Sequence, residues 1–177
     1  MEIKTVLLDS LAVERALKRI AHEIIENNKG VSNVVLLGIA RGGIPVAQKL
    51  VKNISNIENT FVPCANLDIT CFRDDIKRRE STVNEGAKEI DFSLENKDVI
   101  LCDDVLYTGR TVRAGIEAVI AKGRPKSIQL AVLIDRGHKE LPIRADYVGK
   151  NVPTSRDENI LVSITDDNAS VVILKNV

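Results

Sequence analysis

Short apolar runs separated by amphipathic stretches limit the possible fold of this chain more than any other feature. The clearest runs are NVVLLGIA at 33–40, VILCDDV at 99–105 and SIQLAVLID at 127–135. Runs of this length without polar alternation are typical of strands buried on both faces of a parallel sheet. Further strands are expected at 61–70 (FVPCANLDIT), 159–164 (NILVSI) and 170–175 (SVVILK).

Helical patterns lie between the strands. Over 9–28, apolar residues recur at helical spacing, namely Val13, Leu17, Ile20 and Ile24. Asp9 or Ser10 can cap the start of this helix. Two more helices are expected over 44–54 and 111–122. Strands that alternate with helices predict an α/β fold with a central, mainly parallel sheet flanked by helices.

One stretch, residues 73–93, interrupts this order. It is almost wholly polar and has no convincing periodic pattern. In a compact domain such a segment is usually a functional lid or a long surface hairpin. A plain solvated excursion is an equal alternative.

The composition excludes several classes of protein. Of the 177 residues, 44% are hydrophobic and 28% are charged, which is typical of one folded domain. Lys and Arg together number 25, as do Asp and Glu, so any nucleic-acid site must come from a local arrangement of charge. The three cysteines form no CxxC pair, and no signal peptide or membrane-spanning run is evident. We therefore expect reduced thiols and a cytoplasmic protein.

Two adjacent carboxylates, Asp103 and Asp104, end one of the apolar runs. Ligands of open parallel sheets bind at the carboxyl ends of strands, and the hydroxyls of a sugar, with a divalent cation nearby, would satisfy both acids. The next residues, YTGRT at 107–111, can form an anion cradle, because Gly109 lets amides converge and a helix follows. By itself TGRT is more often a plain strand-to-helix turn. Together these features favour a ribose 5-phosphate, whereas P-loop and dinucleotide glycine patterns are absent.

These residues look like a known family. VILCDDVLYTGRT (99–111) resembles the 5-phosphoribosyl-1-pyrophosphate (PRPP) motif of the type I phosphoribosyltransferases. The wider chain resembles the bacterial pyrimidine-operon attenuators of that family, which are also uracil phosphoribosyltransferases. The stretches that carry this likeness are RIAHEIIENNKG, LDITCFRDDI, LYTGRTVRAG and LAVLIDRGHKELPIRADYVGKNVPTS. The resemblance implies a single type I phosphoribosyltransferase domain over 1–177, with a flexible loop at about 73–93 and a small hood from segments around 135–155 and the C-terminus.

The resemblance also implies roles for individual residues. The acid pair would contact the ribose hydroxyls, residues 107–111 would wrap the 5-phosphate, and the loop with Arg41 would hold pyrophosphate. The residues expected to act in catalysis are Arg41, Arg73, Asp103 and Asp104. Those expected to bind PRPP or UMP are Ala40, Arg41, Val99, Ile100, Leu101, Cys102, Asp103, Asp104, Val105, Leu106, Tyr107, Thr108, Gly109, Arg110 and Thr111.

By the same resemblance, residues 73–93 would be a catalytic loop that closes over the reaction centre. Its base would hold Arg73, Asp74 and Asp75, and its tip would carry Lys77, Arg78 and Arg79. A cationic lid would exclude water from the centre. Mg²⁺ would bridge oxygens of pyrophosphate and ribose, with no direct protein ligand. An exposed basic run without function is an equal interpretation of the tip.

Two positions depart from the attenuator pattern. There a threonine precedes the arginine and a bulkier residue follows Arg-Gly, whereas this chain has Ala40 and Gly43. The departure bears on catalytic efficiency more than on binding.

Tyr107 indicates which base is used. Purine salvage enzymes of the hypoxanthine-guanine type resemble this motif but carry an acid at that place, and a phenol, with an ordinary pKa of about 10, is a poor proton acceptor. The resemblance therefore implies uracil, placed under residues 134–149. Asp135, Arg136 and Gly137 would contact its polar edge, partly through backbone atoms.

A basic stripe marks the N-terminal helix. Its members, spaced to lie on one line away from the apolar face, are Arg15, Lys18, Arg19 and His22. By itself such a stripe is more often a solvated face. In the attenuators that the chain resembles, RNA lies on a basic concave face of a dimer. The resemblance therefore implies that the stripe, with Arg144 and Lys150, binds a leader hairpin.

The leading hypothesis is a bifunctional homodimer, or a higher oligomer. When charged with UMP or UTP it would bind pyrimidine-operon leader mRNA and favour termination of transcription. It would also make UMP and pyrophosphate from uracil and PRPP. The alternatives are a plain phosphoribosyltransferase with an inert basic helix, and an RNA-binding regulator with little catalysis.

Overall fold

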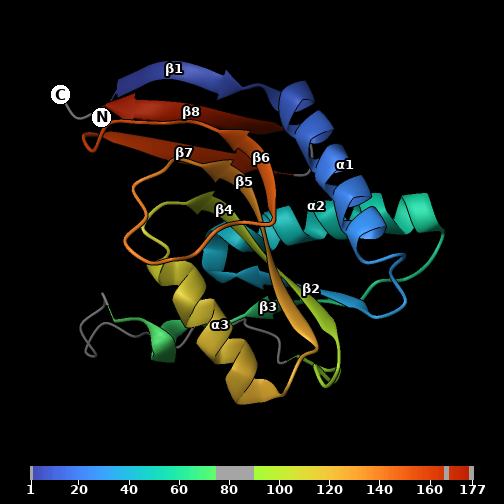
Figure 1. The fold of residues 1–177 in the computed structure, drawn as a ribbon. Coiled ribbons are helices and arrows are strands. Elements are labelled where there is room, and N and C mark those ends of the chain that lie inside the picture. Colours follow the sequence, from blue (N-terminus) through green and yellow to red (C-terminus); the bar gives the residue numbers. More distant parts are fainter. Residues whose placement is uncertain (1, 75–89, 166–167, 176–177) are drawn as a thin grey trace.

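The computed structural model describes residues 2–74, 90–165 and 168–175, and it confirms the predicted α/β architecture (Figure 1). Five parallel strands form the main sheet in the order β3-β2-β4-β5-β6. Their bounds are β2 Val34–Ile39, β3 Cys64–Leu67, β4 Asp98–Leu106, β5 Ser127–Asp135 and β6 Tyr147–Asn151. The central strands β2, β4 and β5 are the three apolar runs of the sequence.

Successive residues of these runs point to opposite faces of the sheet, and both faces are covered. Leu36, Ile100 and Leu133 pack into one apolar cluster with α1 (Ser10–Asn27) and α2 (Ala40–Glu58). Their neighbours, Leu37, Leu101 and Val132, pack into a second cluster with α3 (Arg110–Lys122). This two-sided burial is the reason the runs show no polar alternation.

Helix α1 lies within the predicted range of 9–28 and is one residue shorter at each end. The Asp9 carboxylate caps it by accepting a hydrogen bond from the Ala12 amide at 2.8 Å. Ser10 has a different role, because its hydroxyl accepts a hydrogen bond from the amide of Ala169, near the C-terminal end of the chain, at 3.2 Å.

Helix α2 begins at Ala40, so the expected start at 44 was wrong. Gly42 and Gly43, predicted as loop, belong to its first turn. A Cβ at Gly42 would lie 2.4 Å from the carboxyl carbon of Asp104, and one at Gly43 would lie 2.0 Å from the carbonyl oxygen of Cys102. The glycines therefore let the start of the helix pack directly against the end of β4.

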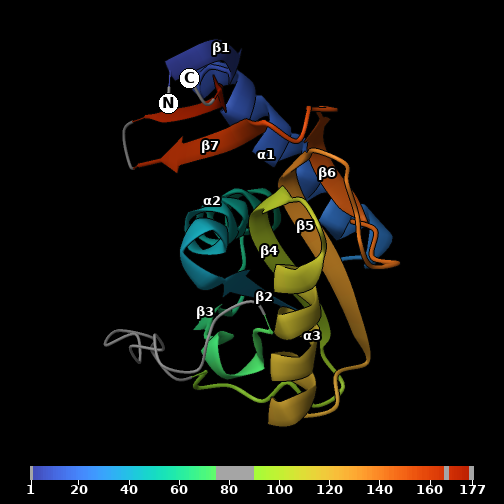
Figure 2. The ribbon, with the colours of Figure 1, turned by 90° about the vertical axis from the view of Figure 1, so that its left-hand side faces the viewer.

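A second, antiparallel sheet of order β1-β8-β7 lies beyond the carboxyl end of β4 (Figure 2). Its strands are β1 Glu2–Leu8, β7 Glu158–Ile164 and β8 Ala169–Lys175. The C-terminal part of the expected hood is therefore strand-paired with the N-terminus, which the sequence reading had left unassigned. Two register shifts in β1 hide its alternation.

Two further expectations need correction. Residues 147–151 were expected in the hood, but they form β6 at the edge of the main sheet. The expected strand at 61–70 is paired only over Cys64–Leu67 and is followed by a short 3₁₀ helix, η1, at Thr70–Phe72. Within the described ranges, no helix is both long enough and apolar enough to cross a membrane.

Candidate active site

The acid pair lies where β4 ends, and its two members face different hollows. Asp103 lines a hollow of about 380 Å³ together with Arg73, Glu140 and the loop at 107–111. Asp104 lines one of about 400 Å³ together with Arg41, Gly42 and Pro45 of α2 and Ser163 of β7. The pair thus separates a space at the start of α3 from a space at the start of α2.

Asp103 is buried, with 5% of its surface exposed. One of its oxygens accepts a hydrogen bond from the Asp104 amide at 3.0 Å. Burial, and next the negative charge of Asp104, raise the pKa of the Asp103 carboxyl well above its ordinary value, and the charge of Arg73 opposes this only in part. The site therefore favours any ligand that brings positive charge or hydroxyl donors to Asp103.

The loop after the acid pair has the geometry that was predicted for an anion cradle. Gly109 has a φ of +91° and lies immediately before α3. The Thr108 hydroxyl accepts a hydrogen bond from the Arg110 amide at 3.4 Å, and Thr111, in the first turn of α3, lines the same hollow. Free amides and the positive end of the helix dipole make this turn suitable for a phosphate.

Arg110 serves the loop in a different way from the one predicted. Its side chain donates to Glu140 at 2.8 Å and to Asp74 at 2.9 Å. It therefore joins the segment after β5 to the residue at the base of the predicted catalytic loop. Of that loop, Asp75, Lys77, Arg78 and Arg79 lie outside the described residues, whereas Arg73 lines the hollow beside Asp103.

The residues predicted to contact uracil gather beside Tyr107, but two of their side chains already have partners. The Arg136 guanidinium lies 4.1 Å from the centre of the Tyr107 ring and donates to Thr154, Ser155 and Glu158 at 2.6–3.1 Å. The Asp135 carboxylate accepts from the Gly137 amide at 3.0 Å and from Lys139 at 2.8 Å. Backbone groups, rather than these side chains, are therefore what this segment offers to a base.

One neighbour of Tyr107 was missed by the sequence analysis. The His138 ring lies edge-on to Tyr107, with 5.9 Å between the ring centres, and its Nε2 lies 2.6 Å from the Thr154 carbonyl. Both His138 and Thr154 belong to the long stretch that carried the family resemblance. The place of His138 beside Tyr107 depends on how that stretch folds back on itself.

The expected set of ligand-binding residues wrongly included the four residues that precede Asp103. Val99, Ile100, Leu101 and Cys102 are 0% exposed and pack between the two helical layers. Their side chains hold the acid pair in place and cannot touch a ligand. The side chain of Ala40 is outside what the structure describes, so its predicted role is untested.

Comparison with known proteins agrees with this geometry. A family model described as "Phosphoribosyl transferase domain" matches residues 5–166. The chain belongs to the phosphoribosyltransferase family. It is 56% identical to the "Bifunctional protein PyrR" of Geobacter sp. (strain M21), over 95% of each chain. It is 54% identical to the protein of the same name from Clostridium novyi (strain NT), over 99% of each chain.

A solved phosphoribosyltransferase shows that the fold extends over nearly the whole chain. The hypoxanthine phosphoribosyltransferase of Trypanosoma cruzi has a TM-score of 0.73 at 20% identity, with 98% of this chain and 97% of that chain covered. The predicted type I fold and the resemblance to PyrR proteins are therefore confirmed. The fold is shared with the purine enzymes, and the prediction of a different base rests on Tyr107.

The basic stripe on α1 is exposed, but Arg19, one of its members, already has partners within the protein. Arg19 donates to the carbonyl oxygens of Val148 and Gly149 at 2.9 and 2.8 Å and pairs with Glu23 at 2.6 Å. It thereby fastens α1 to the edge strand β6. Lys150, on the same strand, reaches the Leu7 carbonyl at 3.3 Å.

The remaining candidates for the RNA face are exposed as predicted. They are Arg15, Lys18 and His22 on α1, and Arg144 in the segment before β6. Lys18 lies 3.4 Å from Glu14, an exposed pair one helical turn apart. Contact between α1 and β6 brings the helix and strand parts of the predicted RNA face together.

The donor chemistry of the site suits a hard divalent cation. Within the described residues, no group of three histidine, cysteine, aspartate or glutamate side chains converges as a metal site. The acid pair nevertheless offers carboxylate oxygens of the kind that Mg²⁺ prefers. A Mg²⁺ ion here would need oxygens of the substrate to complete its coordination.

Proposed function

We propose that this chain transfers the ribose 5-phosphate of PRPP to uracil at the acid pair. We also propose that, when UMP occupies this site, the chain binds the leader RNA of a pyrimidine operon and favours termination of transcription. The observation that carries the proposal is the acid pair with a hollow on each side, in a chain 54–56% identical to bifunctional PyrR proteins over nearly its full length. The class of enzyme is inferred from the family, and the RNA partner is inferred from the similarity to PyrR proteins.

In this proposal the two hollows take the two ends of PRPP. The 5-phosphate lies on the first-turn amides of α3 and the hydroxyls of Thr108 and Thr111. The pyrophosphate lies on the first turn of α2 beside Arg41. The carboxylates of Asp103 and Asp104 bind the ribose hydroxyls between these ends and hold the reacting carbon at a fixed height above the sheet.

The reaction forms a bond from uracil N1 to ribose C1 while the bond from C1 to pyrophosphate breaks, and the proton of uracil N1 is released to water. Bound Mg²⁺ would neutralise the leaving pyrophosphate. Tyr107 would border the uracil, and the Arg136 guanidinium would hold the Tyr107 ring in place from behind. The backbone of residues 135–137 supplies donors and acceptors that can match the polar edge of a pyrimidine.

Gly43 does not argue against catalysis. In the described backbone a Cβ at this position would overlap the Cys102 carbonyl oxygen at 2.0 Å, so glycine is what this close packing requires. The difference from the expected pattern is therefore a matter of how α2 meets β4. We accordingly favour an active enzyme over a regulator with little catalysis.

The RNA partner is supported by the exposed stripe on α1 and by the name of the relatives. A cytoplasmic homodimer would bring two such stripes together on one face. Because UMP is both product and effector, one site can serve both activities, and a ligand that favours the RNA-binding state must itself bind more tightly when RNA is present. The salt dependence of RNA binding should be strong.

Two assays on the purified protein test the proposal. The first measures UMP formed from uracil and PRPP with Mg²⁺, and the second measures binding of a pyrimidine-operon leader hairpin with and without UMP. Turnover together with UMP-enhanced binding supports the bifunctional function. Turnover without enhanced binding would leave a plain phosphoribosyltransferase, and enhanced binding without turnover would leave a regulator.

A further inference from the structure

The segment that follows β5 forms one wall of the anion cradle. The Glu140 amide donates a hydrogen bond to the Thr108 carbonyl oxygen at 2.9 Å, and the Glu140 carboxylate accepts one from Arg110 Nε at 2.8 Å. Between these two contacts, Leu141 lies against Gly109, since a Cβ on that glycine would be 3.5 Å from the Leu141 side chain. The segment therefore touches three successive residues of the cradle.

A carboxylate is an unexpected group beside a phosphate site. Arg110 and Glu140 both line the hollow in which the 5-phosphate is proposed to lie. Like charges repel, so an unpaired carboxylate at this place would weaken phosphate binding. The contact with Arg110 offsets the charge of Glu140, and it makes the position of the guanidinium depend on Glu140.

Stability does not account for the contact between Glu140 and Arg110. Their side chains are 52% and 41% exposed, and exposed ion pairs contribute little to the free energy of folding. The contact instead fixes a conformation, because Nη1 of the same guanidinium donates to Asp74 at 2.9 Å. An arginine held by two carboxylates loses less side-chain entropy when a phosphate binds. A guanidinium carries five N–H donors, so it can keep both carboxylates and still donate to a phosphate.

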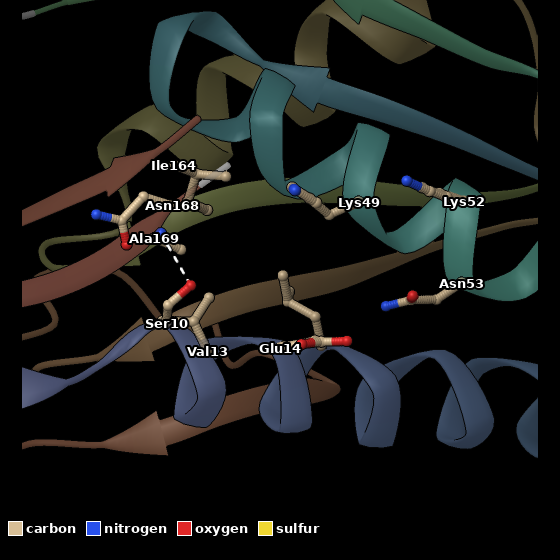
Figure 3. Close-up of a pocket in the computed structure, with 10 residues that line it drawn as sticks. Ser10, Val13, Glu14, Lys49, Lys52, Asn53, Ile164, Asn168 and Ala169 are labelled. Carbon is tan, nitrogen blue, oxygen red and sulfur yellow. Dashed lines mark hydrogen bonds between the residues drawn. The ribbon is translucent and has the colours of Figure 1, made fainter. Parts of the chain in front are cut away.

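A carboxylate at a different hollow shows the contrast. Glu14 lines a hollow of about 270 Å³ between α1 and α2 (Figure 3). Its partner Lys18 lies 3.4 Å away, one turn further along the same helix. That pair lies within one element, whereas Glu140 joins the segment after β5 to the first turn of α3, 30 residues earlier in the chain.

We propose that Glu140 is a positioning residue for the 5-phosphate of PRPP and UMP. It holds the Arg110 guanidinium at the hollow in the orientation that receives the phosphate, and Asp74 supports the same guanidinium from the base of the predicted catalytic loop. Residues 135–137, just before this segment, are those proposed to contact uracil, so one stretch of chain borders both ends of the nucleotide. The inference rests on the proposed function, because the phosphate is that of its substrate and product.

Steady-state kinetics of Glu140→Gln test the positioning role. Glutamine keeps an acceptor oxygen but removes the charge, so the KM for PRPP should rise several-fold while kcat and the KM for uracil stay within about 2-fold. Arg110→Gln should raise the KM for PRPP by about 10-fold, because a charged donor to the phosphate is lost. In the double variant the Glu140 substitution should add nothing, since both act through one guanidinium. The control, Glu14→Gln, should leave all three constants unchanged.

UMP binding, measured by titration calorimetry, decides the inference without turnover. Glu140→Gln should weaken UMP binding by the same factor by which it raises the KM for PRPP. Tighter binding would mean that the carboxylate competes with the phosphate for Arg110, and it would overturn the proposal, as would unchanged affinity or an additive loss in the double variant. The expected UMP pattern without turnover by the unaltered protein would overturn the transfer reaction alone; absence of both UMP binding and turnover would overturn the reaction and the inference together.

Discussion

Strand β4 has a buried carboxylate at its first residue, Asp98, and another near its end, Asp103, and the surroundings of the two differ. Asp98, at the first residue, accepts from Ser127 at 2.8 Å and Asn33 at 3.2 Å, and Lys126 lies 3.5 Å away. Asp103, near the last, forms no ion pair within the described part of the chain and accepts one hydrogen bond from its neighbour's amide. Aspartate on this strand therefore has partners from three other side chains at one end, and a hydrogen bond from the neighbouring amide at the other.

The pKa values follow this difference. Burial opposes ionisation of Asp98, but the hydrogen bonds from Ser127 and Asn33 and the charge of Lys126 outweigh it and lower the pKa. For Asp103, burial and the charge of Asp104 dominate and raise the pKa. A buried acid with built-in partners contributes to the fold, whereas a buried acid without an ion-pair partner is a candidate for binding a ligand.

The largest expected effect separates the two ends of β4 by activity. Asp104→Asn should lower kcat/KM for PRPP by about 1,000-fold, because an amide cannot replace a carboxylate that orients the ribose and attracts the metal. Asp98→Asn, at the other end of the strand, should leave kcat/KM nearly unchanged. Steady-state kinetics of both variants, with circular dichroism to check folding, make the measurement. Normal turnover by Asp104→Asn would show that the acid pair has been assigned wrongly.

The next largest effect concerns Arg136, a buried arginine whose guanidinium donates three hydrogen bonds. Arg136→Met should destabilise the protein by about 3 kcal/mol, because it leaves the hydroxyl of Thr154 and the carbonyls of Ser155 and Glu158 without their donor. Urea denaturation measures the loss. The matched control is Arg156→Met, at an exposed arginine in the turn that holds these acceptors. Its free energy of unfolding should lie within about 0.5 kcal/mol of that of the unaltered protein.

The dependence of stability on pH should have opposite signs at the two ends of β4. The pKa of Asp103 is raised in the folded protein, so its contribution to stability is present at low pH and is lost as pH rises through that value. The pKa of Asp98 is lowered, so its contribution is present above the ordinary aspartate value and is lost as pH falls.

Thermal unfolding of two asparagine variants checks this sign. The Tm of Asp103→Asn should exceed that of the unaltered protein by a margin that grows between acidic and neutral pH. The Tm of Asp98→Asn should fall below it by a margin that grows over the same range. Parallel curves for the two variants would mean that Asp103 has a partner in solution that its surroundings here do not supply.

Much of the fold was predictable, because burial on both faces leaves a plain signal in β2, β4 and β5. Strand β1 left none, since its register shifts break the alternation. The start of α2 was misplaced because glycines usually end helices, whereas Gly42 and Gly43 serve here to bring the helix against β4. In each miss, a contact with a distant part of the chain overrode the local pattern.

The site divides in the same way. The positions of Asp103, Asp104 and Gly109 in the fold were predictable, because one short segment contains the acids, the turn and the start of the helix. The role of Arg136 was not, because its acceptors lie 18 to 22 residues further along the chain. Arg19 was assigned to RNA from helical spacing and the family resemblance, and neither revealed its two carbonyl partners, which are 129 and 130 residues away.

Arg19 gives the smallest expected effect and the finest test of the stripe. Arg19→Ala should weaken RNA binding by about 10-fold and also lower stability by about 1 kcal/mol, since the Val148 and Gly149 carbonyls exchange a charged donor for water. Lys18→Ala, with only an exposed pair to lose, should weaken RNA binding without a measurable change in stability. Uracil kinetics should not change in either. If Arg19→Ala loses stability but binds RNA normally, the guanidinium fastens α1 to β6 and the stripe binds RNA without it.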